Sequence, residues 1–318
     1  MGEPMPSGRA IDHVVLAVRD LDATAARYES LGFTLTPRAA HEDRMGTSNR
    51  LAQFTAKNFI ELLEVDRPDI LARHDFSASP PFFSFGDHNR RAVAEREGLS
   101  MLVFAGDDAR GDIVKFKAAD LPTYAPFDFS RPAKLPDGHQ VTVAFSLAFV
   151  QSPDMPNVAF FVCENRAQEV FWKPEYQSHA NGAIGIVAVY LASTAPERDA
   201  AFVGTMFGGD VTALPGGGYA VACGPSQQLR VLTPEVLGRH DSSLKGLHQT
   251  SPRLVCVALR SRGLQGFTPA AEAGGVFIEW LLAQVGGGYP CRWPATARPL
   301  RIGEERLAPS ALAHKRCC

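Results

Sequence analysis

Short apolar runs that alternate with amphipathic stretches divide this chain into strands and helices. Residues 11–18 form a β-branched run that is typical of a strand. Apolar residues then recur at helical spacing over residues 21–31, and Gly32 is expected to end that helix. Asp22 or Thr24 is the expected N-cap, and the next strand is expected to start directly after the glycine.

The same succession of elements recurs along the chain. Two further strands, one at the end of residues 41–54 and one over residues 59–65, complete a β-α-β-β-β unit. A second unit spans residues 99–164, and shorter versions span residues 183–232 and 253–282. Two such units are expected to pair into one eight-stranded, cleft-like sheet. The predicted fold class is therefore α+β, built from repeated βαβββ modules.

Two polar side chains interrupt the apolar strands of the first unit. His13 lies within the first strand, and Glu61 lies between apolar neighbours on the last. A buried imidazole or carboxylate needs a hydrogen bond, an ion pair or a metal ion. A lone histidine is more often a core residue bonded to the backbone, so the residues alone favour that interpretation.

The order of elements, together with His13, Glu61 and the segment GTSNR before the third strand, resembles the vicinal oxygen chelate superfamily. Its members include glyoxalase I, extradiol dioxygenases and bleomycin-resistance proteins, and the glyoxalase-like domain branch is the most similar. The resemblance implies that His13 and Glu61 bind a metal ion from antiparallel strands of one cleft. It also implies that Asn49, within GTSNR, contacts the substrate.

A second block, CENRAQEVFWKPEYQSHANGA, resembles a block of the same branch. Asn165 stands where that branch has a histidine, so a strong metal ligand is replaced by a weak one. Glu164 is either a compensating oxygen ligand with a catalytic role or a surface carboxylate at a strand end. His179 and Asn181 are either a substrate-binding pair or a structural turn, and Trp172 is either a wall of the substrate site or core.

The implied metal site is incomplete with two protein ligands. Zn, Mn, Fe and Ni all suit one imidazole and one carboxylate. A third ligand is expected from one of four side chains, namely His41, Glu164, Asn165 and His179. In the superfamily the ion is a Lewis acid for a substrate that chelates it through two adjacent oxygens. Glu61 or Glu164 would then be a ligand or a general base.

The later units keep only fragments of this pattern. Alignment of the units puts Met101 at the position of His13 in the second unit and Gly185 there in the third. Glu279, in FIEW, repeats Glu61, in FIEL, but has no histidine partner. It is expected to be either an orphan of the repeat or a hydrogen-bonded core carboxylate.

Composition narrows the class of protein. The 318 residues are 45% hydrophobic and 21% charged with a net charge of −2, which is typical of a soluble globular protein without a nucleic-acid partner. No apolar run approaches the ~20 residues of a membrane span. The scattered cysteines predict a reducing, cytoplasmic setting. Residues 1–180 are expected to form an N-terminal domain of two paired modules. Residues 181–318 would be a degenerate pair with a covering tail.

Two functions from different classes fit this sequence. One is a metal-dependent lyase, isomerase or dioxygenase that binds a small oxygenated substrate. The other is a metal-free protein that binds or sequesters a small molecule between aromatic walls, as bleomycin-resistance proteins do. Either function would be compatible with a homodimer. Metal content is the property that separates them.

Overall fold

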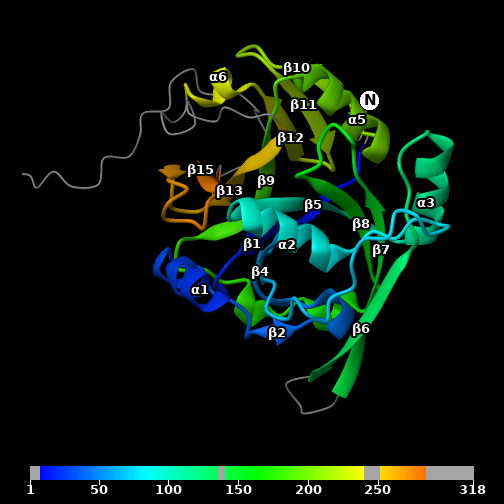
Figure 1. Ribbon diagram of the computed structural model, residues 1–318. Coiled ribbons are helices and arrows are strands. Elements are labelled where there is room, and N and C mark those ends of the chain that lie inside the picture. The colour runs from blue at the N-terminus through cyan, green and yellow to red at the C-terminus, as the bar shows by residue number, and fades with distance from the viewer. Residues whose placement is uncertain (1–7, 135–139, 240–250, 284–318) are drawn as a thin grey trace, which may run out of the picture.

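The computed structural model describes residues 8–134, 140–239 and 251–283, and it contains two β-sheets (Figure 1). The first has eight strands in the order β2-β3-β4-β1-β5-β8-β7-β6. They are β1 (Ile11–Val18), β2 (Ala39–Ala40), β3 (Ser48–Gln53), β4 (Phe59–Glu64), β5 (Gly98–Gly106), β6 (Phe127–Lys134), β7 (Gln140–Val150) and β8 (Ala159–Asn165). The predicted eight-stranded sheet and the α+β class are thereby confirmed.

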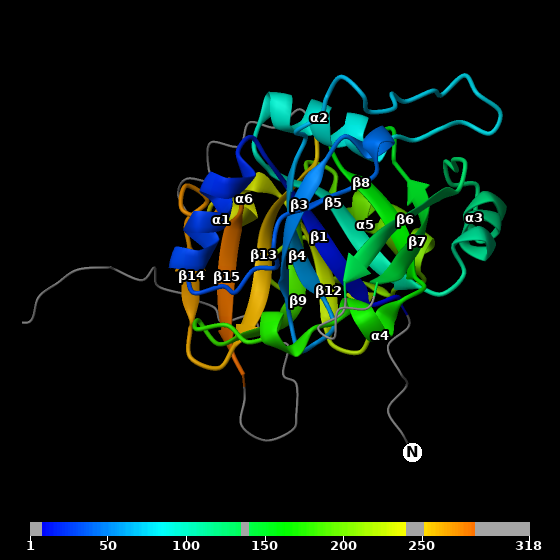
Figure 2. The ribbon, with the colours of Figure 1, turned by 90° about the horizontal axis from the view of Figure 1, so that it is seen from below.

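The second sheet has seven strands in the order β10-β11-β12-β9-β13-β15-β14. They are β9 (Ala183–Ala192), β10 (Val211–Ala213), β11 (Tyr219–Cys223), β12 (Gln227–Leu232), β13 (Arg253–Ser261), β14 (Gly266–Thr268) and β15 (Phe277–Leu282). In Figure 2 strand β13 lies beside the strands of the first sheet, in agreement with the contacts between β13 and β5. The expected tail, residues 285–318, lies outside the described residues.

Helices cover the sheets rather than forming a core of their own. They are α1 (Leu21–Ser30), α2 (Phe85–Glu95), α3 (Ala109–Ala118), α4 (Gln168–Phe171), α5 (Pro196–Phe207) and α6 (Pro234–Leu237), with 3-10 turns η1 (Asp43–Met45) and η2 (Pro174–Tyr176). Helix α1 packs on β3 and β4, and α5 packs on β11 and β12. In the described part of the chain, no helix has the length and apolarity needed to span a membrane.

Successive side chains of each strand point to opposite faces of the first sheet, and each face carries an apolar layer. Val14 and Leu16 point from β1 into a large cluster that also contains Val189 of β9 and Val257 of β13, so this cluster joins the sheets. Val15 points the other way, into a second cluster inside the curl of the first sheet. His13 shares the face of Val15, because strand side chains alternate. The first sheet therefore directs His13 into its own concave side.

Two details of the first module differ from the sequence predictions. Asp20, not Asp22 or Thr24, caps α1, and its carboxylate accepts a hydrogen bond of 2.8 Å from the backbone N–H of Ala23. The segment that begins at Phe33 does not form a strand. Its backbone is bound elsewhere, since the N–H of Thr34 bonds the ring of His179 at 2.9 Å.

The register of the sheets shows how the modules correspond. Strands β1 and β4 are parallel neighbours, not the antiparallel strands expected, and Val15 lies opposite Glu61. In the third module, helix α5 begins 8 residues after Ala188 (196 − 188), as α1 begins 8 residues after His13 (21 − 13). Ala188, rather than Gly185, therefore occupies the position of His13. The alignment from sequence differs by three residues (188 − 185), because the apolar strand β9 contains no polar side chain that fixes which residue matches His13.

Helix α2 contributes an acid-sensitive element to the fold. His88 is buried, and its Nε2 donates to the carbonyl of Ser100 at 3.1 Å. Burial lowers the pKa of His88 to about 4, and the hydrogen bond to Ser100 opposes this shift only partly. Burial likewise lowers the pKa of His74 to about 4.

Stability is therefore expected to fall on acidification before the carboxylates titrate. The folded pKa of His88 lies below its ordinary value of 6.5, so its contribution is complete above pH 6.5 and is lost as the pH falls through about 4. The shift corresponds to about 3 kcal/mol of unfolding free energy. Urea denaturation at pH 7, 6, 5 and 4 should show this loss, and His88→Gln should weaken the pH dependence. Identical pH dependence in both proteins would contradict the assignment.

Candidate metal and substrate site

His13 and Glu61 face each other on neighbouring strands. Both side chains are buried, and Nε2 of His13 lies 3.8 Å from Oε2 of Glu61. The other ring nitrogen, Nδ1, is 2.5 Å from a carboxylate oxygen of Asp12. Phe59 stacks on the imidazole with ring centroids 4.2 Å apart. Because Asp12 takes up Nδ1 and Phe59 covers the ring face, Nε2 is the nitrogen directed at Glu61.

His41 and Asn49 approach the same carboxylate from the β2–β3 side. Nε2 of His41 lies 3.6 Å from Oε1 of Glu61, and the amide nitrogen of Asn49 donates to that oxygen at 2.6 Å. This nitrogen also lies 3.2 Å from Nε2 of His41. The amide oxygen of Asn49 is buried and has no hydrogen-bond partner among the described residues. Such an orphaned acceptor is costly unless a ligand supplies a donor or a metal ion.

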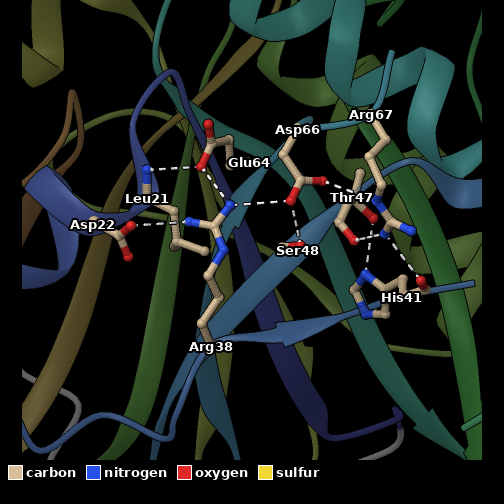
Figure 3. Close-up of polar contacts among 9 residues, drawn as sticks. All are labelled: Leu21, Asp22, Arg38, His41, Thr47, Ser48, Glu64, Asp66 and Arg67. Carbon is tan, nitrogen blue, oxygen red and sulfur yellow. Dashed lines mark hydrogen bonds and ion pairs between the residues drawn. The ribbon is translucent and has the colours of Figure 1, made fainter. Parts of the chain in front are cut away.

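The loop that carries His41 is held by hydrogen bonds to its backbone and ring (Figure 3). Nδ1 of His41 is 2.8 Å from the hydroxyl of Thr47. The guanidinium of Arg67 donates to the carbonyls of both residues, at 3.0 and 2.8 Å. His41 thus repeats the arrangement of His13, with Nδ1 occupied by an outer partner and Nε2 turned toward Glu61.

Ion pairs then connect this loop to α1 and to the end of β4, as Figure 3 shows. Asp66 accepts from Ser48 at 2.6 Å and from Arg38 at 3.0 Å, and Arg38 also pairs with Glu64 and Asp22. Burial raises the pKa of Asp66, but its hydrogen bonds with Ser48 and Arg38 outweigh burial and lower the pKa. Asp66 is therefore ionised at neutral pH and anchors the strand that presents Asn49.

These polar groups lie at one end of a small, mostly apolar cavity of about 50 Å³. Its walls include six phenylalanine rings: Phe59, Phe85, Phe129, Phe145, Phe161 and Phe171. Such a wall excludes water and strengthens the electrostatic interactions of the carboxylate within it.

A second, larger cavity of about 600 Å³ lies between the two sheets. The two cavities share Asp12, Cys163 and Asn165 as lining residues. Trp172 lines the larger one. Burial, together with the negative charges of Asp12 and nearby glutamates, raises the pKa of Cys163 well above its ordinary value, so the thiol stays protonated.

The fold and this site can be compared with known proteins. Residues 11–205 match the family described as glyoxalase-like domain, which covers more than half of the chain. The chain belongs to the glyoxalase-like domain family. This confirms the predicted membership of the vicinal oxygen chelate superfamily. No curated protein matches the chain in sequence.

Solved structures share the fold of this glyoxalase-like chain. A hypothetical protein from Staphylococcus aureus has a TM-score of 0.65 at 13% identity, over 86% of this chain and 99% of that one. A Mn(II)-bound glyoxalase from Novosphingobium aromaticivorans has a TM-score of 0.50 at 14% identity, over 87% and 83%. A mutant 4-hydroxymandelate synthase from Streptomyces coelicolor has a TM-score of 0.50 at 13% identity, over 89% and 95%.

Several site residues predicted for the glyoxalase-like domain lie elsewhere in the described structure. Glu164 lines neither cavity, and it accepts hydrogen bonds from the N–H of Ala109 at 3.1 Å and from Arg166 at 2.8 Å. Glu164 therefore lies near the end of β8, and its carboxylate bonds the first N–H of helix α3. His179 bonds the backbone at both ring nitrogens, and Asn181 bonds the carbonyl of Leu31 at 2.9 Å. This pair holds a structural turn.

The second module of the glyoxalase-like domain contributes apolar residues where the first contributes polar ones. The register puts Met101 and Phe161 at the positions of His13 and Glu61. Among the described residues, no group of three or more His, Cys, Asp and Glu side chains is arranged so that it could hold a metal ion. The donors of the first module nevertheless suit one chemically, with two imidazoles, one carboxylate and the orphaned oxygen of Asn49.

Proposed function

We propose that this protein is a metal-dependent enzyme that acts on a small oxygenated molecule as a lyase, isomerase or dioxygenase. The observation that carries the proposal is that two buried imidazoles turn Nε2 toward the two oxygens of one carboxylate, at 3.8 and 3.6 Å. His13, His41 and Glu61 would hold the ion. When bound, a divalent ion would supply Lewis-acid stabilisation of negative charge on two adjacent substrate oxygens.

The residues of the chain supply positioning and exclusion of water. Asp12 and Thr47 fix the orientation of the two imidazoles, so that neither ring has to reorganise on binding. The amide of Asn49 orients Glu61 and presents an oxygen that can accept a hydrogen bond from a substrate hydroxyl. Glu61 is the carboxylate placed to act as a ligand or general base, whereas Glu164 lines neither cavity and bonds Ala109 and Arg166.

Two solved structures with the same fold support this proposal. A structure with the same fold is a Mn(II)-bound glyoxalase, and another is a hydroxymandelate synthase mutant.

Three cysteines of the described residues are buried and free, which favours a reducing, cytoplasmic location. The division at residue 180 into two domains is supported by the change of sheet between β8 and β9. A homodimer stays a prediction.

The alternative is a metal-free protein that binds or sequesters a small molecule. It is favoured by the amide nitrogen of Asn49, which lies 3.2 Å from Nε2 of His41 and 2.6 Å from Oε1 of Glu61. A hydrogen-bond donor therefore already bridges the two atoms that a metal ion would have to join. The alternative is also favoured by the absence, among the described residues, of three charged or imidazole groups arranged for a metal. In this case the aromatic cavity would bind its ligand by burial of apolar surface.

Elemental analysis of the purified protein separates the two functions. After reconstitution with Mn, Fe, Zn or Ni and removal of excess ion, the enzyme should retain about one ion per chain. His41→Ala should retain less than the native protein, because it removes one imidazole donor. No retention of any of these ions by the native protein would exclude the metal-dependent function and leave the binding function.

A further inference from the structure

We propose that the larger cavity is an anion-binding chamber for the remote part of the substrate, so that the substrate carries a carboxylate or phosphate away from its reactive oxygens. The assignment of the reactive end rests on the proposed function above. The selectivity of the chamber for anions does not, because it depends on residues outside the small cavity.

Size and continuity show why one ligand would occupy both spaces. The small cavity offers about 50 Å³, which is too little for a whole substrate, whereas the larger one offers about 600 Å³, within the range of ligand pockets. Asp12, Cys163 and Asn165 line both. The aromatic wall is continuous as well, since Phe59 stacks on His13 and lies 5.9 Å from the ring of Trp172.

The charges of the two spaces have opposite sign. Of the described residues that line the larger cavity, three are charged, namely Asp12, Lys57 and Arg260. The two cations outnumber the single carboxylate of Asp12, so the larger cavity has an excess of positive charge. In the small cavity, Asp12 and Glu61 are the carboxylates, and the aromatic wall lacks a lysine or arginine among the described lining residues. An anionic group is therefore favoured in the larger cavity and disfavoured next to Glu61.

Each half of the chain supplies one of the cations. Lys57 lies in the turn between β3 and β4 with a left-handed backbone, φ 59°, which is uncommon for a residue other than glycine. The turn is fixed to β9 because the N–H of Ala56 bonds the carbonyl of Ile184 at 3.0 Å and Asn58 bonds the backbone of Ile186. The ammonium lies 5.3 Å from the centre of the Trp172 ring. This strained placement persists because the second half of the chain over-determines it.

Arg260 enters the chamber from β13 of the second sheet. The side chain of Gln227, also in the lining, bonds the backbone N–H of Ile11 at 2.8 Å and so keeps β12 beside β1. The degenerate C-terminal half thus has a role in substrate recognition. It closes the chamber and contributes half of its positive charge.

The test compares binding of phenyl phosphate, phenylacetate and the neutral 2-phenylethanol to the full chain by calorimetry. Native protein should bind at least one anion more tightly than the neutral compound, and the tighter anion identifies phosphate or carboxylate as the preferred group. Lys57→Gln and Arg260→Gln should each weaken anion binding about fivefold and leave 2-phenylethanol binding unchanged. Lys117→Gln and Arg262→Gln remove the same charge outside the chamber lining and should bind as the native protein does.

Equal affinity of the native protein for the anions and the neutral compound would overturn the proposal. Equal weakening in the control variants would also overturn it, because the effect would then be one of net charge. Metal content measured on the same samples separates this proposal from the preceding one. Anion selectivity in a protein that retains no metal would leave the chamber intact and exclude only the metal-dependent function.

Discussion

Glu61→Ala is expected to abolish stoichiometric metal binding while leaving the fold intact. The substitution removes the one carboxylate that both imidazoles face, so only two nitrogen donors would remain. Loss of a group that only orients a ligand typically costs 10- to 100-fold in affinity, and loss of a ligand should cost more than about 100-fold. Metal retained after dialysis, measured by elemental analysis, should fall from about one ion per chain to a trace.

Glu164→Ala is the matched control for this prediction. It removes a carboxylate from the corresponding last strand of the second module, where the side chain bonds the N–H of Ala109 and Arg166 rather than the cavity. It should retain the metal content of the native protein. Native metal content in Glu61→Ala, or equal loss in both variants, would contradict the assignment of Glu61. Glu61→Gln keeps the shape of the side chain and can keep the hydrogen bond from Asn49. It should therefore fold as the native protein does and still lose the metal, which separates loss of a ligand from misfolding.

The strands and modules could be predicted from sequence because alternation and glycine stops are local properties. Residues 11–18 were predicted as a strand, and β1 has the same bounds. His13 and Glu61 could be paired because each lies in an apolar strand where a polar group needs a partner. The register of the third module could not be predicted, since β9 contains no histidine, carboxylate or amide side chain that could be aligned with His13.

His41 could be predicted only as one of several candidate ligands. It lies outside a regular strand, in a loop that follows no periodic pattern. What directs it to Glu61 is the bond from Thr47 and the guanidinium of Arg67, two contacts that join residues 6 and 26 positions away. Hydrogen bonds of this kind depend on the loop conformation, and the sequence contains no local signal for them.

The comparison of Glu61 with Glu279 shows how neighbours decide the role of a carboxylate. The two glutamates occupy the same register, since Cys256 and Phe277 pair as His13 and Phe59 do. The hydroxyl of Tyr190, from the neighbouring module, donates to Glu279, and Arg230 donates to Tyr190 at 2.8 Å. Burial raises the pKa of Glu279. Glu279 is therefore the hydrogen-bonded core carboxylate, as one of the two interpretations predicted.

Residues 179–183 show how a motif can leave two interpretations open, here a substrate-binding pair or a structural turn. His179 and Asn181 have the residue types of a substrate-binding pair, yet the ring nitrogens of His179 and the amide nitrogen of Asn181 bond the backbone of the first module. The amide oxygen of Asn181 accepts from the N–H of Ala183 at 3.0 Å. Burial lowers the pKa of His179, and the carbonyl of Gln53 fixes its ring. A polar residue in a motif can thus serve the connection between modules, and only the partners of its atoms distinguish the two roles.

Gly86→Ala is expected to destabilise the fold and to loosen the site at the same time. Gly86 lies in the first turn of α2, and a Cβ there would be 2.1 Å from the backbone oxygen of Met45. Met45 ends η1 and lines the small cavity, and the next residue, Gly46, has a left-handed φ of 63° that leaves the turn little freedom to retreat. Backbone must therefore shift, which should cost about 3 kcal/mol of unfolding free energy in urea denaturation.

Gly216→Ala is the control, because a Cβ at that position meets nothing within 4 Å among the described residues and its backbone needs no left-handed conformation. Its unfolding free energy should stay within about 0.5 kcal/mol of the native value. The displacement of η1 by Gly86→Ala acts on the loop between His41 and Thr47, so metal affinity should fall together with stability. Equal stability of the two variants would show that α2 and η1 can separate without cost. Lost stability with unchanged metal affinity would show that His41 is held independently of α2, by Arg67 and Thr47 alone.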